Sequence, residues 1–230
     1  RSTIAQRVHR FSQILASSLA AFGYTIIDEV YFDTLKIYAP GVAGKLAARA
    51  RESRINLRLI DSDHLGITLD ETTKREDIEA LWQVFRPHTA ARIDIEHLDQ
   101  SVTENIPPAL RRNSPLLEHA NFHRYHSETE MMRYLRRTAG KDVSLGRSMI
   151  PLGSCTMKLN ATSELLPVSI RDFANLHPFA PLDQTQGYQQ LFEELEAMLC
   201  EITGFNAISL QPNAGSQGEY AGLLCIRQYH

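Results

Sequence analysis

The sequence has little cysteine, no long apolar run and no strong excess of charge, and each shortage excludes a class of protein. Its three cysteines are widely spaced and form no CxxC pair, which argues against a disulfide framework or a cysteine zinc site. No apolar run approaches the roughly 20 residues that a bilayer-spanning helix needs, and the first residues lack the pattern of a signal peptide. The formal net charge of −3 gives no reason to expect nucleic acid or an anionic membrane as a partner.

What is present is the composition of an ordinary globular protein, with 230 residues of which 43% are hydrophobic and 22% are charged. We expect a soluble protein in a reducing compartment, either the bacterial cytoplasm or, in a eukaryote, the mitochondrial matrix. The chain starts at Arg1 and not at Met, and His230 falls inside a helical pattern that shows no stop signal. We therefore expect a piece of a longer protein.

Residues 1–102 are predicted to form a small α+β domain. Apolar residues spaced three and four apart predict a helix from Ile4 to Phe22, ended by Gly23. Helices on one side of a small, largely antiparallel sheet are the expected architecture. The other predicted elements are strands at 24–27, 34–39, 57–60 and 65–69, a helix at 44–55, and a helix that starts at a capping box of Thr73 and Glu76 and stops at Pro87.

Residues 103–143 read as a connection that carries one helix. Three prolines and scattered charges are typical of a linker, and Ser127 with Glu130 has the spacing of a helix capping box. Three histidines precede that helix, but no acidic or cysteine partner stands at ligand spacing, so no metal is expected. These histidines are His119, His123 and His126.

Residues 144–230 begin with an irregular polar stretch and then become regular. Tyr188–Ile202 gives the cleanest helical pattern of the chain, closed by Gly204. A short apolar run, Phe205–Leu210, reads as a buried strand, and a glycine-containing turn and another helical pattern follow it. A helix, a buried strand, a turn and a helix in this order are typical of the start of a doubly wound α/β domain.

The turn within Gln211–Leu223 is the strongest candidate for a ligand site. Ser216 and Glu219 have capping-box spacing, so a helix is expected to start near Ser216 with backbone N–H groups pointing into the turn. Those donors and the helix dipole favour a phosphate. The alternative is an ordinary turn whose glycines only ease packing.

Several longer motifs lie along the chain, namely Tyr31–Thr34, Gly66–Thr73, Asn121–Tyr134, Ile150–Asn160, His177–Phe179, Gly187–Gln190 and Gln211–Gly222. Together they resemble one family, glycine dehydrogenase (decarboxylating), the P-protein of the glycine cleavage system. The resemblance extends over essentially the whole chain.

The resemblance implies a pyridoxal-phosphate enzyme with the fold of the aspartate aminotransferase superfamily, often built as two similar halves in one chain. Residues 1–102 would close the first half, and residues 144–230 would begin the second, which binds the cofactor. The family decarboxylates glycine and passes the aminomethyl group to the lipoyl arm of the H-protein. A homo-oligomer is also expected.

The resemblance assigns the cofactor phosphate to one turn and places further residues near the active-site entrance. Asn213, Gly215, Ser216 and Gln217 would hold the phosphate. The entrance residues would be Ser154, Thr156, Asn160, His177 and Phe179.

The catalytic lysine of the family is expected to lie outside this chain. It follows the glycine turn in the family, between a His and a Thr, and none of the lysines here stands in that setting. Lys158 precedes the turn, so we expect a structural or channel-lining charge there. The chain alone is therefore expected to be inactive and not to bind the cofactor.

Two other functions remain open from the sequence. The chain could be a complete non-catalytic module that binds a partner protein, or a freestanding binder of a phosphate ligand. An incomplete α/β domain would also leave apolar faces exposed to solvent, which predicts self-association.

Overall fold

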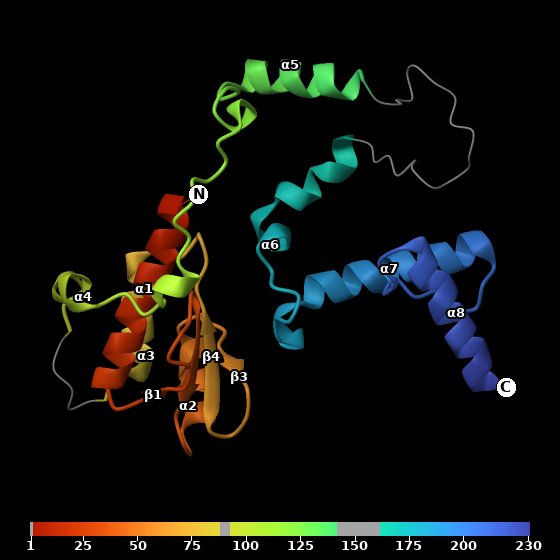
Figure 1. The fold of residues 1–230 in the computed structure, drawn as a ribbon. Helices are drawn as coiled ribbons and strands as arrows, with labels where there is room; N and C mark the ends of the chain where they lie inside the picture. The colour runs from red at the N-terminus through yellow and green to blue at the C-terminus, as the bar shows by residue number, and fades with distance from the viewer. Residues whose placement is uncertain (1, 88–92, 142–161) are drawn as a thin grey trace. The chain divides into compact units, whose positions relative to one another are not determined.

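A computed structural model of the chain describes residues 2–87, 93–141 and 162–230 (Figure 1). The chain divides into two compact units, residues 1–150 and residues 151–230, and each is described by itself. The domain boundaries after residues 102 and 143 stay predictions.

The first unit is built on a four-stranded antiparallel sheet with the strand order β1-β2-β4-β3. In the central pair, Leu35 lies opposite Ile67 and Ile37 lies opposite Leu65, and all four side chains are buried. The alternation of apolar and polar residues therefore gives the sheet one apolar face. The strands are β1 (Thr25–Ile26), β2 (Thr34–Tyr38), β3 (Arg58–Leu59) and β4 (His64–Thr68).

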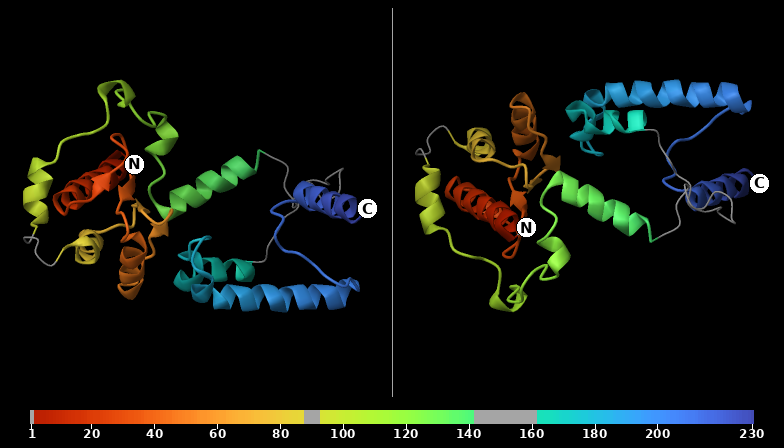
Figure 2. Two further views of the ribbon diagram at one scale, coloured as in Figure 1. Left: turned by 90° about the horizontal axis from the view of Figure 1, so that it is seen from below. Right: turned by 90° about the horizontal axis from the view of Figure 1, so that it is seen from above.

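Among the described residues, helices α1 to α4 pack around this sheet, and they confirm the predicted α+β architecture. Helix α1 contacts β1 and β2, α2 contacts β3 and β4, and α3 and α4 pack on α1 (Figures 1 and 2). The one indole of the chain, Trp82, donates to the Ser18 hydroxyl at 2.7 Å, which ties α3 to α1 inside the core. The helices are α1 (Ser2–Ala21), α2 (Ala43–Glu52), α3 (Arg75–Phe85) and α4 (Ile95–Ser101).

The ends of these helices partly follow the sequence signals. Gly23 takes a φ of 93° just after α1, as its predicted role at the end of that helix requires. The capping box of Thr73 and Glu76 is wrong, because the N-cap of α3 is Lys74, whose N–H donates to the Asp77 carboxylate at 2.8 Å. The Asp70 N–H donates to the Thr73 hydroxyl at 3.0 Å, so Thr73 belongs to the preceding turn.

Residues 106–141 contain two short 3₁₀ helices, η1 (Pro108–Leu110) and η2 (Ala120–Phe122), followed by α5 (Glu128–Ala139). The predicted cap of α5 is confirmed: the Ser127 hydroxyl accepts the Glu130 N–H at 3.2 Å. No residue of α5 is buried.

The described part of the second unit is helical. Gly204 ends α7 with a φ of 73°, as predicted. The strand predicted at 205–210 is wrong: these residues form no strand, because the described residues of the unit offer no neighbouring strand to pair with. The elements are η3 (Thr162–Leu165), η4 (Pro167–Ser169), α6 (Arg171–Ala174), η5 (Leu182–Gln184), α7 (Gln186–Thr203) and α8 (Gly215–Tyr229).

Along the stretches that the structure describes, no helix has both the length and the apolar character to cross a membrane.

Candidate functional site

The start of α8 leaves several backbone donors available. Its N-cap, Ala214, has extended dihedrals (φ −153°, ψ 162°) and makes no side-chain capping hydrogen bond. The Gly218 N–H donates to the Ala214 carbonyl at 3.0 Å and closes the first turn. The three N–H groups of residues 215–217 precede that bond, so they have no acceptor inside the helix.

The capping box predicted from Ser216 and Glu219 is wrong. The helix begins at Gly215, so Ser216 already lies in the first turn. Ala214 has no side-chain oxygen that could cap the helix. Because Ala214 has no such oxygen, no capping side chain accepts a hydrogen bond from the N–H groups of residues 215–217.

The charge at this helix start also favours an anion. The first turn of α8 contains no acidic residue. In α5, by contrast, Glu128 and Glu130 occupy the first turn and Ser127 caps it. The positive end of the α8 dipole is therefore not neutralised locally and can attract a phosphate.

The turn also has room for a ligand to approach the main chain. A Cβ atom added at Gly215 would meet no atom within 4 Å, and one at Gly218 would meet only the Pro212 Cβ, at 3.9 Å. Asn213, Ser216 and Gln217 are exposed. The structure thus brings the four predicted phosphate ligands together on one accessible turn whose N–H groups suit a phosphate.

Two of the five predicted entrance residues are described. In the loop after α6, the Phe179 N–H donates to His177 Nδ1 at 3.0 Å, and the two rings lie 5.8 Å apart. Phe179 is 90% exposed. The hydrogen bond and the ring contact are both local to this loop. Ser154, Thr156, Asn160 and the excluded candidate Lys158 lie outside the described residues.

Two of the three histidines before α5 make local contacts. His119 Nδ1 accepts the Asn121 N–H at 3.2 Å, and His123 Nε2 lies 2.6 Å from the Leu117 carbonyl. Within residues 2–87, 93–141 and 162–230, no cluster of three His, Cys, Asp or Glu side chains could hold a metal ion.

Sequence reasoning missed a polar network that joins α1 to the residues after α4. His9, Ser12 and Gln13 are buried on α1, although they are polar. Their spacing of three and four residues places them on one side of the helix, and this was the available signal.

The comparisons with known proteins agree with the motifs. Residues 2–85 match the family described as glycine cleavage system P-protein. Over 227 residues, 99% of this chain, the sequence is 52% identical to the glycine dehydrogenase (decarboxylating) of Cupriavidus metallidurans. The chain spans 23% of the length of that relative. The resemblance predicted from the sequence is confirmed.

Proposed function

Since this chain is homologous to a segment of the glycine cleavage system P-protein, we propose that it forms the phosphate-binding part of a pyridoxal-phosphate enzyme that decarboxylates glycine. The observation that supports this role for particular residues is the uncapped start of α8. The N–H groups of Gly215, Ser216 and Gln217 bind the cofactor phosphate, with the Ser216 hydroxyl and the Asn213 amide as further donors.

When bound, pyridoxal phosphate supplies an electron sink for the electron pair that remains when glycine loses carbon dioxide. The contribution of this chain is to bind and orient the phosphate end of the cofactor. Backbone N–H groups suit this role, because they are fixed by the helix and need no side-chain ordering. We assign the α8 start to positioning and not to proton transfer.

The lysine that would bind the cofactor covalently follows the glycine turn in the family, and residues 211–230 contain no lysine. We propose that the isolated chain is inactive for this reason. It does not retain pyridoxal phosphate, and the α8 start keeps a weak affinity for the phosphate group alone.

The partners follow from the same proposal. Glycine is the substrate of the whole enzyme, the lipoyl H-protein receives the aminomethyl group, and the enzyme is a homo-oligomer in the bacterial cytoplasm. A doubly wound α/β domain of the aspartate aminotransferase type would be completed by segments beyond those described.

A second candidate function is a non-catalytic module that binds a partner protein. The observation that favours it is the exposure of apolar side chains on both long helices of the second unit, including Leu195, Met198 and Leu223. Titration of the chain with lipoylated H-protein distinguishes the two functions: micromolar binding to the isolated chain supports the module, and its absence supports the enzyme part.

The phosphate site is tested by Ala214→Asp in the 230-residue chain. The extended N-cap can hold an aspartate whose carboxylate accepts the open N–H groups and repels an anion. We expect the affinity for inorganic phosphate to fall by about tenfold, while helix stability rises by about 1 kcal/mol. Amide shifts of residues 215–217 in an NMR titration measure the binding.

The matched control is Ala197→Asp, which adds the same charge at an exposed position of α7. It should leave the phosphate titration unchanged. Equal phosphate binding by wild type and Ala214→Asp would contradict the site. A stable imine between pyridoxal phosphate and a lysine of this chain, detected by its absorbance, would contradict the proposed inactivity.

A further inference from the structure

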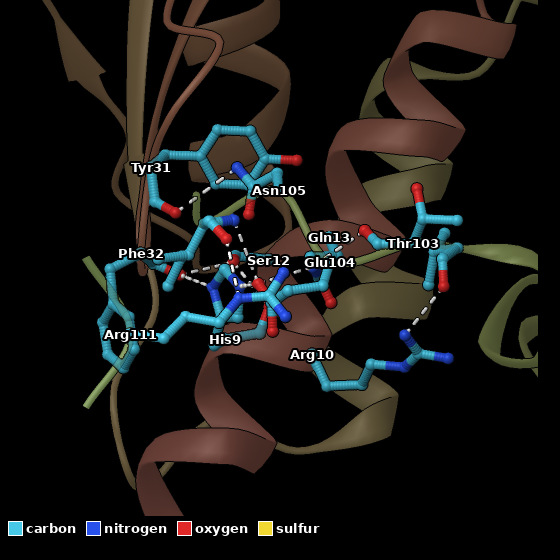
Figure 3. A network of polar contacts seen from close by, with 12 residues as sticks. His9, Arg10, Ser12, Gln13, Tyr31, Phe32, Thr103, Glu104, Asn105 and Arg111 are labelled. Atoms are coloured by element: carbon cyan, nitrogen blue, oxygen red, sulfur yellow. Dashed lines mark hydrogen bonds and ion pairs between the residues drawn. The ribbon is translucent and has the colours of Figure 1, made fainter. Parts of the chain in front are cut away.

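A network of hydrogen bonds holds the residues after α4 against α1 (Figure 3). At its centre is His9, which is 5% exposed. Its Nδ1 lies 2.7 Å from the Phe32 carbonyl, and its Nε2 lies 2.7 Å from Glu104 Oε1. The imidazole therefore bridges the loop before β2 and the segment that follows α4.

Both partners of His9 are oxygens that accept hydrogen bonds. A carbonyl cannot donate, and a carboxylate cannot donate either. A neutral imidazole carries one N–H, so it can make only one of the two bonds with an ionised Glu104. Both contacts form together when one additional proton is present on the pair.

The surroundings of Glu104 favour its ionised form. Burial raises the pKa of Glu104, but hydrogen bonds from the Ile106 N–H and from His9, with the charges of His9 and Arg111, outweigh it and hold the pKa below its ordinary value. The Ile106 N–H donates to Glu104 Oε1 at 3.1 Å. With an ionised Glu104, both contacts can form only when both ring nitrogens of His9 carry protons.

Other charged and titratable groups surround the pair. On α1, Arg10 donates to the Asp99 carboxylate at 2.7 Å and to the Val102 carbonyl at 2.9 Å. Arg111 donates to the Ile106 carbonyl at 2.8 Å. Tyr31, 6.4 Å from the His9 ring, has a pKa that burial raises.

Neutral donors complete the attachment. The Gln13 amide donates to the Thr103 carbonyl at 2.9 Å, and the Asn105 amide lies 3.3 Å from the Glu29 carbonyl. The Ser12 hydroxyl donates to the same Phe32 carbonyl that His9 contacts, at 2.6 Å. These bonds do not depend on protonation, so the segment keeps part of its attachment when the histidine is neutral.

We propose that His9 and Glu104 form a proton-dependent clamp that fixes residues 102–106 on α1. One proton closes the clamp, because it lets His9 donate to the loop and to the segment at once. When the imidazole loses that proton, one of its nitrogens faces an acceptor with a lone pair and the contact opens. The clamp thus couples the protonation of one buried side chain to the order of the connection that follows the α+β body.

A second histidine and carboxylate pair in the same body provides a comparison. His64 Nδ1 contacts Oδ1 and Oδ2 of Asp61 at 2.8 and 2.9 Å. The two residues are only three positions apart in the sequence. Both bonds come from one ring nitrogen, so the neutral tautomer with its proton on Nδ1 can make them. This pair does not need the imidazolium form.

The clamp is tested on the 230-residue chain by NMR between pH 4 and pH 9. The ring ¹⁵N shifts of His9 report whether both nitrogens carry protons, and the exchange of the Ile106 amide reports the closed segment. We expect the protection factor of Ile106 to be highest while both ring nitrogens carry protons and to fall by about tenfold when one of these protons is lost. It should also fall when Glu104 becomes protonated at lower pH.

Three variants complete the test. His9→Gln should remove the fall of the Ile106 protection factor toward higher pH, and Glu104→Gln should remove both this fall and the one toward lower pH. His64→Gln should leave the wild-type profile unchanged. Fluorescence of Trp82 checks that each variant is folded. Glu104, whose side chain is 43% exposed, decides the question if His9→Gln does not fold.

A protection factor that is constant across the pH range in wild type would overturn the clamp. Unchanged pH dependence in folded Glu104→Gln would overturn it as well. The test does not involve phosphate, so its result is independent of the site at the start of α8.

Discussion

The α+β body and the helices of residues 162–230 carry the same kind of apolar pattern, but they differ in what covers it. Leu15 on α1 has no exposed surface, whereas Leu195 on α7 is 40% exposed and Ile202 is 78% exposed. Helix α1 is covered by the sheet and by α3 and α4. Period-3.6 patterning therefore specifies a helix and its apolar face, but the burial of that face depends on a partner.

This difference has a thermodynamic consequence. Burial of an apolar side chain supplies about 1.5–3 kcal/mol, and most of the stability of a protein helix comes from such packing. The body of residues 2–106 has this contribution, and α7 and α8 have little of it within the described residues. We expect mutations of equivalent residues in the two regions to have very different effects.

The largest effect should come from Leu15→Ala. The substitution leaves a cavity in a closed core, and the free energy of unfolding should fall by about 2–5 kcal/mol. Leu195→Ala is the matched change on α7 and should cost less than about 1 kcal/mol. Urea unfolding followed by Trp82 fluorescence and by circular dichroism measures both. Equal losses in the two variants would show that the apolar face of α7 is covered in solution.

A smaller effect is expected from a buried hydroxyl. Ser18 donates to the Leu15 carbonyl at 2.7 Å and accepts the Trp82 indole N–H, also at 2.7 Å. Ser18→Ala leaves that indole N–H without a partner in the core, which should lower the free energy of unfolding by about 1–3 kcal/mol.

The control for Ser18 is an exposed serine with the same local bond. Ser169 donates to the Leu166 carbonyl, three residues earlier, at 2.8 Å. Ser169→Ala should change stability by less than about 0.5 kcal/mol. If thermal unfolding shows similar shifts for the two variants, the core contact of Ser18 is not the cause.

The two regions also differ in how far the sequence could predict them. The alternation in residues 34–38 predicted the buried face of β2, because each residue of a paired strand has a fixed side. Gly23 and Gly204 predicted two helix ends, since both take a positive φ that other residues adopt at a cost. These signals come from residues that are close together in the sequence, and they were sufficient to predict the buried face of the strand and the two helix ends.

Several predictions were wrong or missing where a contact with another segment of the chain determines the structure. Phe205–Leu210 has the composition of a strand, but a strand exists only when another segment pairs with it. Helix α4 was missed, although Asp94 caps it by accepting the Glu96 N–H at 3.0 Å. His9 meets Glu104 from 95 residues away in the chain, and no spacing rule predicts that contact. At the turn before α8, the helix start was predicted correctly, but the residue at its N-cap was not.

The two helix-ending glycines give a further comparison, with an expected effect of about 1 kcal/mol. Gly23→Ala forces a Cβ into left-handed backbone within the α+β body and should lower its free energy of unfolding by that amount. Gly204→Ala has the same backbone cost at the end of α7, but it should reduce helix content without changing the Trp82-monitored transition. Coupled changes in both signals for Gly204→Ala would contradict separate stability of the two regions.

The smallest effect concerns Asp70, which holds the turn before α3. Hydrogen bonds from the Thr72 hydroxyl and from the Thr72 and Thr73 N–H groups outweigh the effect of burial and lower the pKa of this carboxyl below 3.8. Because the folded-state pKa is lowered, the stabilisation is present above the unfolded value and is lost as pH falls through the folded value.

Asp70→Asn keeps an acceptor oxygen but cannot titrate, so the decline in stability below about pH 4 should become shallower. Asp183→Asn, in the second unit, should leave that decline unchanged when Trp82 fluorescence follows unfolding in urea between pH 2.5 and pH 6. Parallel curves for wild type and Asp70→Asn would show that the acid sensitivity of the α+β body arises from other carboxylates, with Glu104 as the next residue to substitute.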